Sequence, residues 1–103
     1  MSGAIGTTTR FTLARDVRWR LVDGEVVVVV QQRGEVLGLN ETASLAFERA
    51  AAGASFGDIV TSLLEELDVD ERALTEDLRL FFAGLASDGL VTVATIDAPG
   101  GAP

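Results

Sequence analysis

The side chains of this sequence that could carry acid–base chemistry are carboxylates gathered around residues 65–70. Glu65 and Glu66 are adjacent, and Asp68 and Asp70 follow them. Two carboxylates can act as general acid and general base when their surroundings favour different protonation states. These four lie between two predicted helices, however, where helix caps and solvated turns commonly place carboxylates. We therefore interpret the cluster as structural.

Other groups that enzymes use are missing. The sequence has no His and no Cys, so the usual general base, the thiol nucleophile and the usual transition-metal ligands are absent. Ser44 and Ser55 have no visible base to activate their hydroxyls. The segment PGGAP, residues 99–103, is not followed by a helix as a phosphate-binding loop would be. We expect no enzymatic activity, no cofactor and no metal site.

The charge of the chain narrows the class of partner. A formal charge of -8 disfavours attraction to nucleic acid or to anionic lipid, because both depend on clustered cations. The longest apolar run is too short to span a membrane, and the N-terminus lacks the pattern of a signal peptide. We expect a cytoplasmic protein whose partner is a protein or peptide, with neither nucleic acid nor membrane involved.

Length and composition indicate one folded domain. The chain has 103 residues, and 48% of them are hydrophobic, which is enough to build a core. Both ends are rich in small, polar or turn-forming residues, which bury too little area to offset the entropy of ordering them. We expect a flexible N-terminal tail at 1–10, a folded domain at 11–93 and a flexible C-terminal tail at 94–103.

Residues 17–39 have the pattern of three antiparallel strands. The segment VRWRLV alternates, with Val17, Trp19 and Leu21 on one face. Asp23-Gly24 predicts a tight turn of the primed type, which leads into the run of five valines, Val26 to Val30. A second reversal within QQRG leads into EVLGL, residues 35–39. The valine strand is then central, with one face on the helices. Its other face is covered by Phe11, Leu13 and the N-terminal arm, by a second copy of the protein, or by an enzyme with which the protein works.

From Asn40 onward the period becomes helical. Asn40 or Thr42 begins a first helix that Gly53 ends, and Ser55 begins a second. Asp70 begins a third helix, which Gly89 ends, and residues 90–93 form a short closing strand. The predicted fold class is α+β: a three-stranded antiparallel sheet followed by a three-helix bundle, similar to a winged helix-turn-helix.

The third helix has a core stripe and two flanks. On a helical wheel the core stripe consists of Leu74, Leu78, Phe81 and Leu85. Small residues beside bulky apolar ones on either flank would let another backbone approach. One flank consists of Ala73, Asp77, Leu80 and Gly84, and the other of Thr75, Arg79, Phe82 and Ala86.

The order of these signals resembles the PqqD-like family, the small RiPP recognition elements that present precursor peptides to modifying enzymes. The resemblance covers residues 11–93 and rests on the segments DGEVVVV, GEVLGLN, TASLAFERAAAG, SFGDIVTSLLEEL and DLRLFFAGLASDGLV. QQRGEV lacks the proline of members dedicated to pyrroloquinoline quinone biosynthesis. The chain is therefore more similar to members that serve lasso-peptide and radical-SAM systems.

The resemblance implies a protein without catalytic activity that binds a leader peptide. The leader adds as a strand to the edge of the third strand, in the cleft against the third helix. Gly38 either lets the peptide backbone approach or marks a bulge. The implied peptide-binding residues are Glu35, Val36, Leu37, Gly38 and Leu39 of the strand, and Leu74, Asp77, Leu78 and Phe81 of the helix. The flank that holds Arg79 and Phe82 is the alternative.

The implied partners are a ribosomal precursor peptide and a modifying enzyme such as a radical-SAM enzyme, a protease or a cyclase. A homodimer remains open. Two other functions share the predicted architecture. A winged-helix nucleic-acid binder would need a basic third helix, whereas this helix has two Arg against Glu71, Glu76, Asp77 and Asp88. A structural or oligomerisation module would explain the valine face without a ligand.

Overall fold

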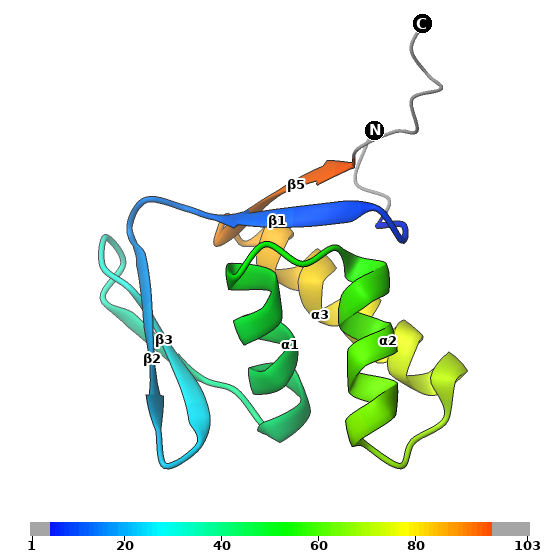
Figure 1. The fold of residues 1–103 in the computed structure, drawn as a ribbon. Coiled ribbons are helices and arrows are strands. Elements are labelled where there is room, and N and C mark those ends of the chain that lie inside the picture. Colours follow the sequence, from blue (N-terminus) through cyan, green and yellow to red (C-terminus); the bar gives the residue numbers. More distant parts are fainter. Residues whose placement is uncertain (1–4, 96–103) are drawn as a thin grey trace, which may run out of the picture.

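A computed structural model describes residues 5–95, which form an α+β fold with two antiparallel sheets and three helices (Figure 1). The three-stranded antiparallel sheet is present as predicted, in the order β2-β3-β4. The closing strand predicted at 90–93 is present as β5, but it forms a second sheet with β1, a strand that was not predicted. The elements are β1 (Thr9–Leu13), β2 (Val17–Val22), β3 (Glu25–Val30), β4 (Glu35–Gly38), α1 (Glu41–Ala51), α2 (Phe56–Glu66), α3 (Glu71–Ser87) and β5 (Val91–Thr95).

The folded structure extends beyond the expected limits of 11 and 93. Strand β1 begins at Thr9 and pairs with β5, so that Phe11 lies opposite Val93. Ile5 also belongs to the core, with 7% of its surface exposed. The pairing with β5 satisfies backbone groups that a free tail would leave to water. The remaining parts of the expected tails, 1–4 and 96–103, lie outside the described residues.

The β2-β3 hairpin forms as its sequence predicts. Asp23 and Gly24 have φ angles of 55° and 85°, which is the pair of positive values that a type I′ turn requires. The register places Val17 opposite Val30 and Val22 opposite Glu25. One face of the valine strand is the core face, because Val26, Val28 and Val30 are buried, whereas Val27 and Val29 are only half-buried.

The helices begin and end at the predicted residues. The side chains of Asn40, Ser55 and Asp70 accept hydrogen bonds from the backbone of the first turns of α1, α2 and α3. Gly53 and Gly89 follow α1 and α3 with φ angles of 100° and 80°. These are left-handed conformations that glycine adopts without steric cost.

The core differs from the helical-wheel prediction at one pair of aromatic residues. Phe82, assigned to a flank of α3, has 0% of its surface exposed, whereas Phe81, assigned to the core stripe, is half-buried. The reason is strand β1: the ring of Phe11 stacks on Phe82 with centroids 4.1 Å apart. Phe11 therefore packs on α3 and does not cover the outer side of the valine strand.

A buried hydroxyl joins the sheet to α1. The backbone N–H of Val26 donates to Ser44 Oγ at 2.8 Å, and Ser44 Oγ donates to the carbonyl of Leu39 at 3.2 Å. Ser44 is buried, so its hydroxyl satisfies a strand N–H that water cannot reach. The hydroxyl thereby holds the end of β4 against α1.

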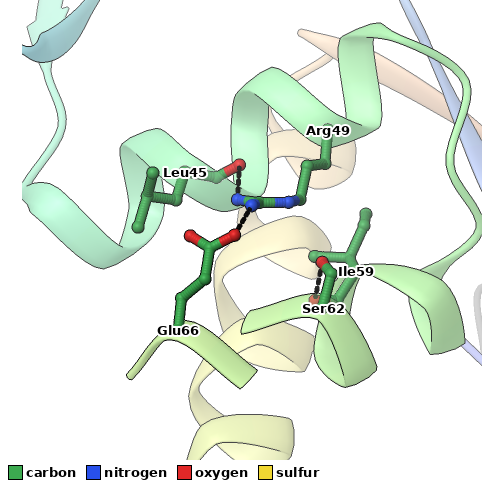
Figure 2. Close-up of polar contacts among 5 residues, drawn as sticks. All are labelled: Leu45, Arg49, Ile59, Ser62 and Glu66. Carbon is green, nitrogen blue, oxygen red and sulfur yellow. Dashed lines mark hydrogen bonds and ion pairs between the residues drawn. The ribbon is translucent and has the colours of Figure 1, made fainter. Parts of the chain in front are cut away.

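The carboxylates around residues 65–70 have structural contacts. Asp70 caps α3, with the Ala73 N–H 2.9 Å from Asp70 Oδ2. Glu66 pairs with Arg49, which also donates to the Leu45 carbonyl, and so links α2 to α1 (Figure 2). Among the described residues no group of His, Cys, Asp or Glu is arranged to hold a metal ion. No helix in this part of the chain is long and apolar enough to cross a membrane.

Candidate functional site

Strand β4 has one free edge. Within residues 5–95 it pairs only with β3, in the register Val28 opposite Leu37 and Val29 opposite Val36. The Leu39 N–H donates to the Val26 carbonyl at 2.9 Å. Because hydrogen-bonded and non-hydrogen-bonded pairs alternate along an antiparallel ladder, the backbone of Leu37 faces β3. The backbone N–H and C=O groups of Val36 and Gly38 therefore point away from the sheet.

The side chains of β4 point to two different faces. Leu37 lies on the same face as the buried Val28, toward the helices, and is 36% exposed. Val36 lies on the opposite face beside Val29 and is 64% exposed. Gly38 continues the regular ladder opposite Val27, with no positive φ and with open space where a Cβ would stand. Of the two interpretations of Gly38, the bulge is therefore not present.

A groove of about 320 Å³ lies along one flank of α3. All four α3 residues predicted to bind the peptide line it. It is closed by the start of α1 and by the connection between α2 and α3. The lining residues are Asn40, Thr42, Ala43, Val69, Ala73, Leu74, Asp77, Leu78 and Phe81.

The chain ties β4 to α3 at both ends. At one end, β4 leads directly into Asn40, which caps α1 and lines the groove. At the other end, the guanidinium of Arg33, in the β3-β4 turn, donates to the carbonyl of Asp88, the C-cap residue of α3. The free edge of β4 and the groove are therefore linked through Asn40 and Arg33, although no residue of β4 itself lines the groove.

The opposite flank of α3 borders a different hollow. Thr75 and Arg79 face a space of about 590 Å³ that the segment 6–8 and the start of α2 complete. Arg79 lies 3.6 Å from Glu76 and 5.9 Å from the ring centre of Phe56. Phe82, the apolar residue expected to mark this flank, is part of the core.

Several groove residues were not among those predicted. Ala73 was noted only as a flank residue and Asn40 only as a cap, and Thr42, Ala43 and Val69 were not assigned to the site. Val69 carried the one sequence signal that could have pointed here: it is an apolar residue between Asp68 and Asp70, and it is 46% exposed.

The groove is apolar with one charge. Asp77 is the charged residue among those that line it, and it forms no ion pair within the described chain. The two cations of α3, Arg72 and Arg79, face a separate hollow with Glu71 and Glu76. An occupant of the groove would therefore meet mostly apolar side chains, the polar side chains of Asn40 and Thr42 and one carboxylate, and no cation.

The sequence profile of the family described as Coenzyme PQQ synthesis protein D (PqqD) matches residues 25–91. The chain belongs to the PqqD family. The matched segment contains β3, β4 and all three helices, and with them every residue of the groove and of the free edge. Strands β1 and β2 lie before it. No curated protein matches this PqqD-family chain significantly.

Two solved structures share the fold of this PqqD-family protein. One is described as TbiB1 in complex with the TbiA(beta) leader peptide, with a TM-score of 0.74 and 28% sequence identity, over 84% of this chain and 99% of that one. The other is described as lasso peptide synthetase B1 complexed with the leader peptide, with a TM-score of 0.73 and 26% identity, over 80% and 96%.

Proposed function

We propose that this PqqD-family protein is a non-catalytic peptide chaperone. It binds the leader of a ribosomally synthesised precursor by β-strand addition to β4 and presents the precursor to a modifying enzyme. The observation that carries this proposal is the free edge of β4, which leads through Asn40 to the groove on α3. Two structures that share the fold, at 28% and 26% identity, are described as complexes with leader peptides.

The residues have separate roles in this proposal. The outward N–H and C=O groups of Val36 and Gly38 bond the peptide backbone, which gives affinity that depends little on sequence. Because side chains alternate along a strand, every second residue of the peptide then lies on the same face as Leu37 and faces the helices. These side chains enter the groove at Leu74, Leu78 and Phe81, where one buried aliphatic side chain contributes roughly 1.5 to 3 kcal/mol.

The remaining site residues complete the proposal. Glu35 and Leu39 lie at the two ends of the edge, and Asp77 interacts with the nearest polar or cationic group of the peptide. We describe the arrangement as winged-helix-like, with the β3-β4 hairpin as the wing beside the three helices. The proposed folded unit includes the predicted domain 11–93. The proposed site of action is the cytoplasm, because ribosomal precursors are made there.

Nucleic-acid binding has no supporting observation. A recognition helix needs cations toward the phosphates. The exposed residues of α3 and its cap instead include Glu71, Glu76, Asp77 and Asp88, against Arg72 and Arg79. Approach of a phosphate backbone to this helix would be repulsive.

Calorimetric titration of the purified protein with the synthetic cognate leader tests the proposal. We expect saturable binding of one leader per chain, weaker binding of a leader with scrambled sequence, and no binding of duplex DNA. Incubation with the full precursor should leave the mass of the peptide unchanged. A mass change that survives removal of contaminating enzymes, or the absence of leader binding, contradicts the proposal.

A further inference from the structure

The β2-β3-β4 sheet has a face turned away from the helices, called here the outer face. It consists of Arg18, Arg20 and Val22 of β2, Glu25, Val27 and Val29 of β3, and Val36 of β4. The register places Arg18, Val29 and Val36 in one row across the sheet, and Arg20, Val27 and Gly38 in the next. Each row therefore runs from a cation on β2 through an apolar centre to the free edge of β4.

No described element covers the outer face. The helices lie on the other side of the sheet (Figure 1), where the ring of Phe47 in α1 packs 5.6 Å from that of Trp19. Val36 is 64% exposed. The β2-β3 part of the face forms a hollow of about 530 Å³, lined by Arg18, Trp19, Arg20, Val27, Val29 and Gln31.

The charge of the outer face differs from that of the rest of the molecule. Residues 41–88, which contain the helices, carry eleven Asp or Glu residues and three Arg. On the outer face, by contrast, Arg18 and Arg20 stand beside valines and outnumber the one carboxylate, Glu25, and neither arginine forms an ion pair within the described residues. Charges on facing surfaces favour a partner of the opposite sign. A partner of this face would therefore present carboxylates around an apolar centre.

We propose that the outer face is the docking surface for the modifying enzyme, and that the docking site on the enzyme is apolar with flanking carboxylates. This inference rests on the proposed function. A leader strand bound to β4 would extend the sheet beyond Val36, and its outward side chains would continue the rows of the outer face. An enzyme docked there contacts both the sheet and the bound leader, so it can distinguish the loaded protein from the empty one.

A second copy of the chain is a poor occupant of the same face. In a twofold dimer the same surface patch meets itself, so residues of one copy face those of the other. Arg18 and Arg20 would then lie near the arginines of the second copy, and Glu25, at the hairpin end of the face, is the one carboxylate against these two cations in each copy. Like charges brought together in an interface oppose association.

The test compares two double variants with the same change in charge. Arg18→Glu with Arg20→Glu reverses the cations of the outer face, and Arg72→Glu with Arg79→Glu reverses two cations of α3. The probe is the purified modifying enzyme that processes the cognate precursor. Its affinity for the leader-loaded protein is measured by biolayer interferometry at about 0.1 M and about 1 M salt, where the Debye length is about 10 Å and about 3 Å. Leader affinity is measured separately by calorimetry.

We expect the outer-face variant to bind the enzyme at least about tenfold more weakly while it binds the leader like the parent. The α3 variant should keep both affinities within about twofold, and high salt should weaken the parent complex.

If the outer-face double variant does not fold, the single variant Arg20→Glu replaces it in the test, because no hydrogen bond or ion pair of the Arg20 side chain is seen in the described residues. Equal enzyme affinity of parent and outer-face variant overturns the inference, and so does a parent dimer that the variant dissociates. Loss of leader binding by the parent would instead refute the proposed function.

Discussion

The three-stranded sheet ends in two edges, β2 and β4, that differ in chemistry. On β2 the Arg18 guanidinium donates to the carbonyls of Arg15 and Val17, at 2.8 and 3.2 Å, so one outward carbonyl of this edge is already bonded. Arg18 and Arg20 also add charge, which natural proteins use to protect sheet edges. On β4, Val36, Leu37 and Gly38 are uncharged. The chain after this strand reaches the groove on α3 through Asn40. The comparison supports the proposal that β4 accepts a strand and that β2 resists one.

The largest expected effect comes from proline at an outward position of β4. Val36→Pro removes an outward N–H without breaking a bond to β3, and edge strands tolerate proline there. It leaves a carbonyl of the bound leader unpaired, which costs about 1 to 3 kcal/mol, or roughly five- to a hundredfold in affinity. Calorimetry with the cognate leader measures this loss.

Matched substitutions locate that effect. Leu21→Pro removes an outward N–H from β2, because the bond from the Gln31 N–H to the Asp16 carbonyl sets the alternation of that ladder. Its leader affinity should stay within about twofold of the parent. Val36→Ile keeps the N–H and should bind normally. Leu37→Pro breaks a bond to β3 and should lower the melting temperature. Equal losses for Val36→Pro and Leu21→Pro would contradict the assignment of the site to β4.

A smaller effect is expected from charge in the groove. Ala73→Glu places a carboxylate among the apolar lining residues and close to Asp77, so we expect about a tenfold loss of leader affinity. Thr75→Glu is the control, because Thr75 faces the hollow on the opposite flank of α3. If the Thr75 variant loses affinity and the Ala73 variant does not, the leader occupies the other flank.

The hydroxyl that holds the end of β4 should affect stability more than binding. Ser44→Ala leaves the buried Val26 N–H without a partner, so we expect the free energy of unfolding to fall by about 1 to 3 kcal/mol. Chemical denaturation of the variant measures the change. Ser62→Ala is a suitable control, because Ser62 Oγ donates to the Ile59 carbonyl within α2 and is not tied to the sheet (Figure 2). Equal stability of parent and Ser44 variant would show that this bridge is dispensable.

The smallest effect is expected at Gly38. A Cβ at this position meets no atom within 4 Å, and the backbone does not require positive φ. The added methyl of Gly38→Ala would point to the outer face and not along the edge, so both stability and leader affinity should stay close to those of the parent. A loss of affinity beyond about tenfold would show that the bound peptide approaches the outer face at this point.

Local patterns predicted most of the fold, because the β2-β3 hairpin and the three helices are determined by residues that are close together in the sequence. The Asp23-Gly24 turn and the alternation of VRWRLV define the β2-β3 hairpin, and Asn40, Ser55 and Asp70 mark the three helix starts. The closing strand β5 was also predicted locally, but no local pattern indicated β1 or its pairing with β5. The two strands are far apart in the sequence, with Phe11 opposite Val93, so only the folded chain brings them together.

The candidate site was predictable to a similar degree. The resemblance named the free strand and four residues of α3 that line one groove. It missed lining residues such as Asn40 and Val69, because these come from connections whose position depends on the packing of the helices. The wrong assignment of Phe81 to the core stripe and of Phe82 to a flank has the same cause, because a helical wheel does not show that β1 buries Phe82. The register of the β3-β4 ladder was needed to tell which backbone groups of β4 point outward.

Amide hydrogen exchange followed by NMR tests the central claim most directly. In the free protein the Leu37 amide should exchange slowly, because it bonds to β3, and the amides of Val36 and Gly38 should exchange fast. Saturation with the cognate leader should slow Val36 and Gly38 and leave Trp19 and Leu21, on the β2 edge, unchanged. If the leader binds and the amides of Val36 and Gly38 stay fast, or if protection arises on β2 instead, strand addition to β4 is contradicted.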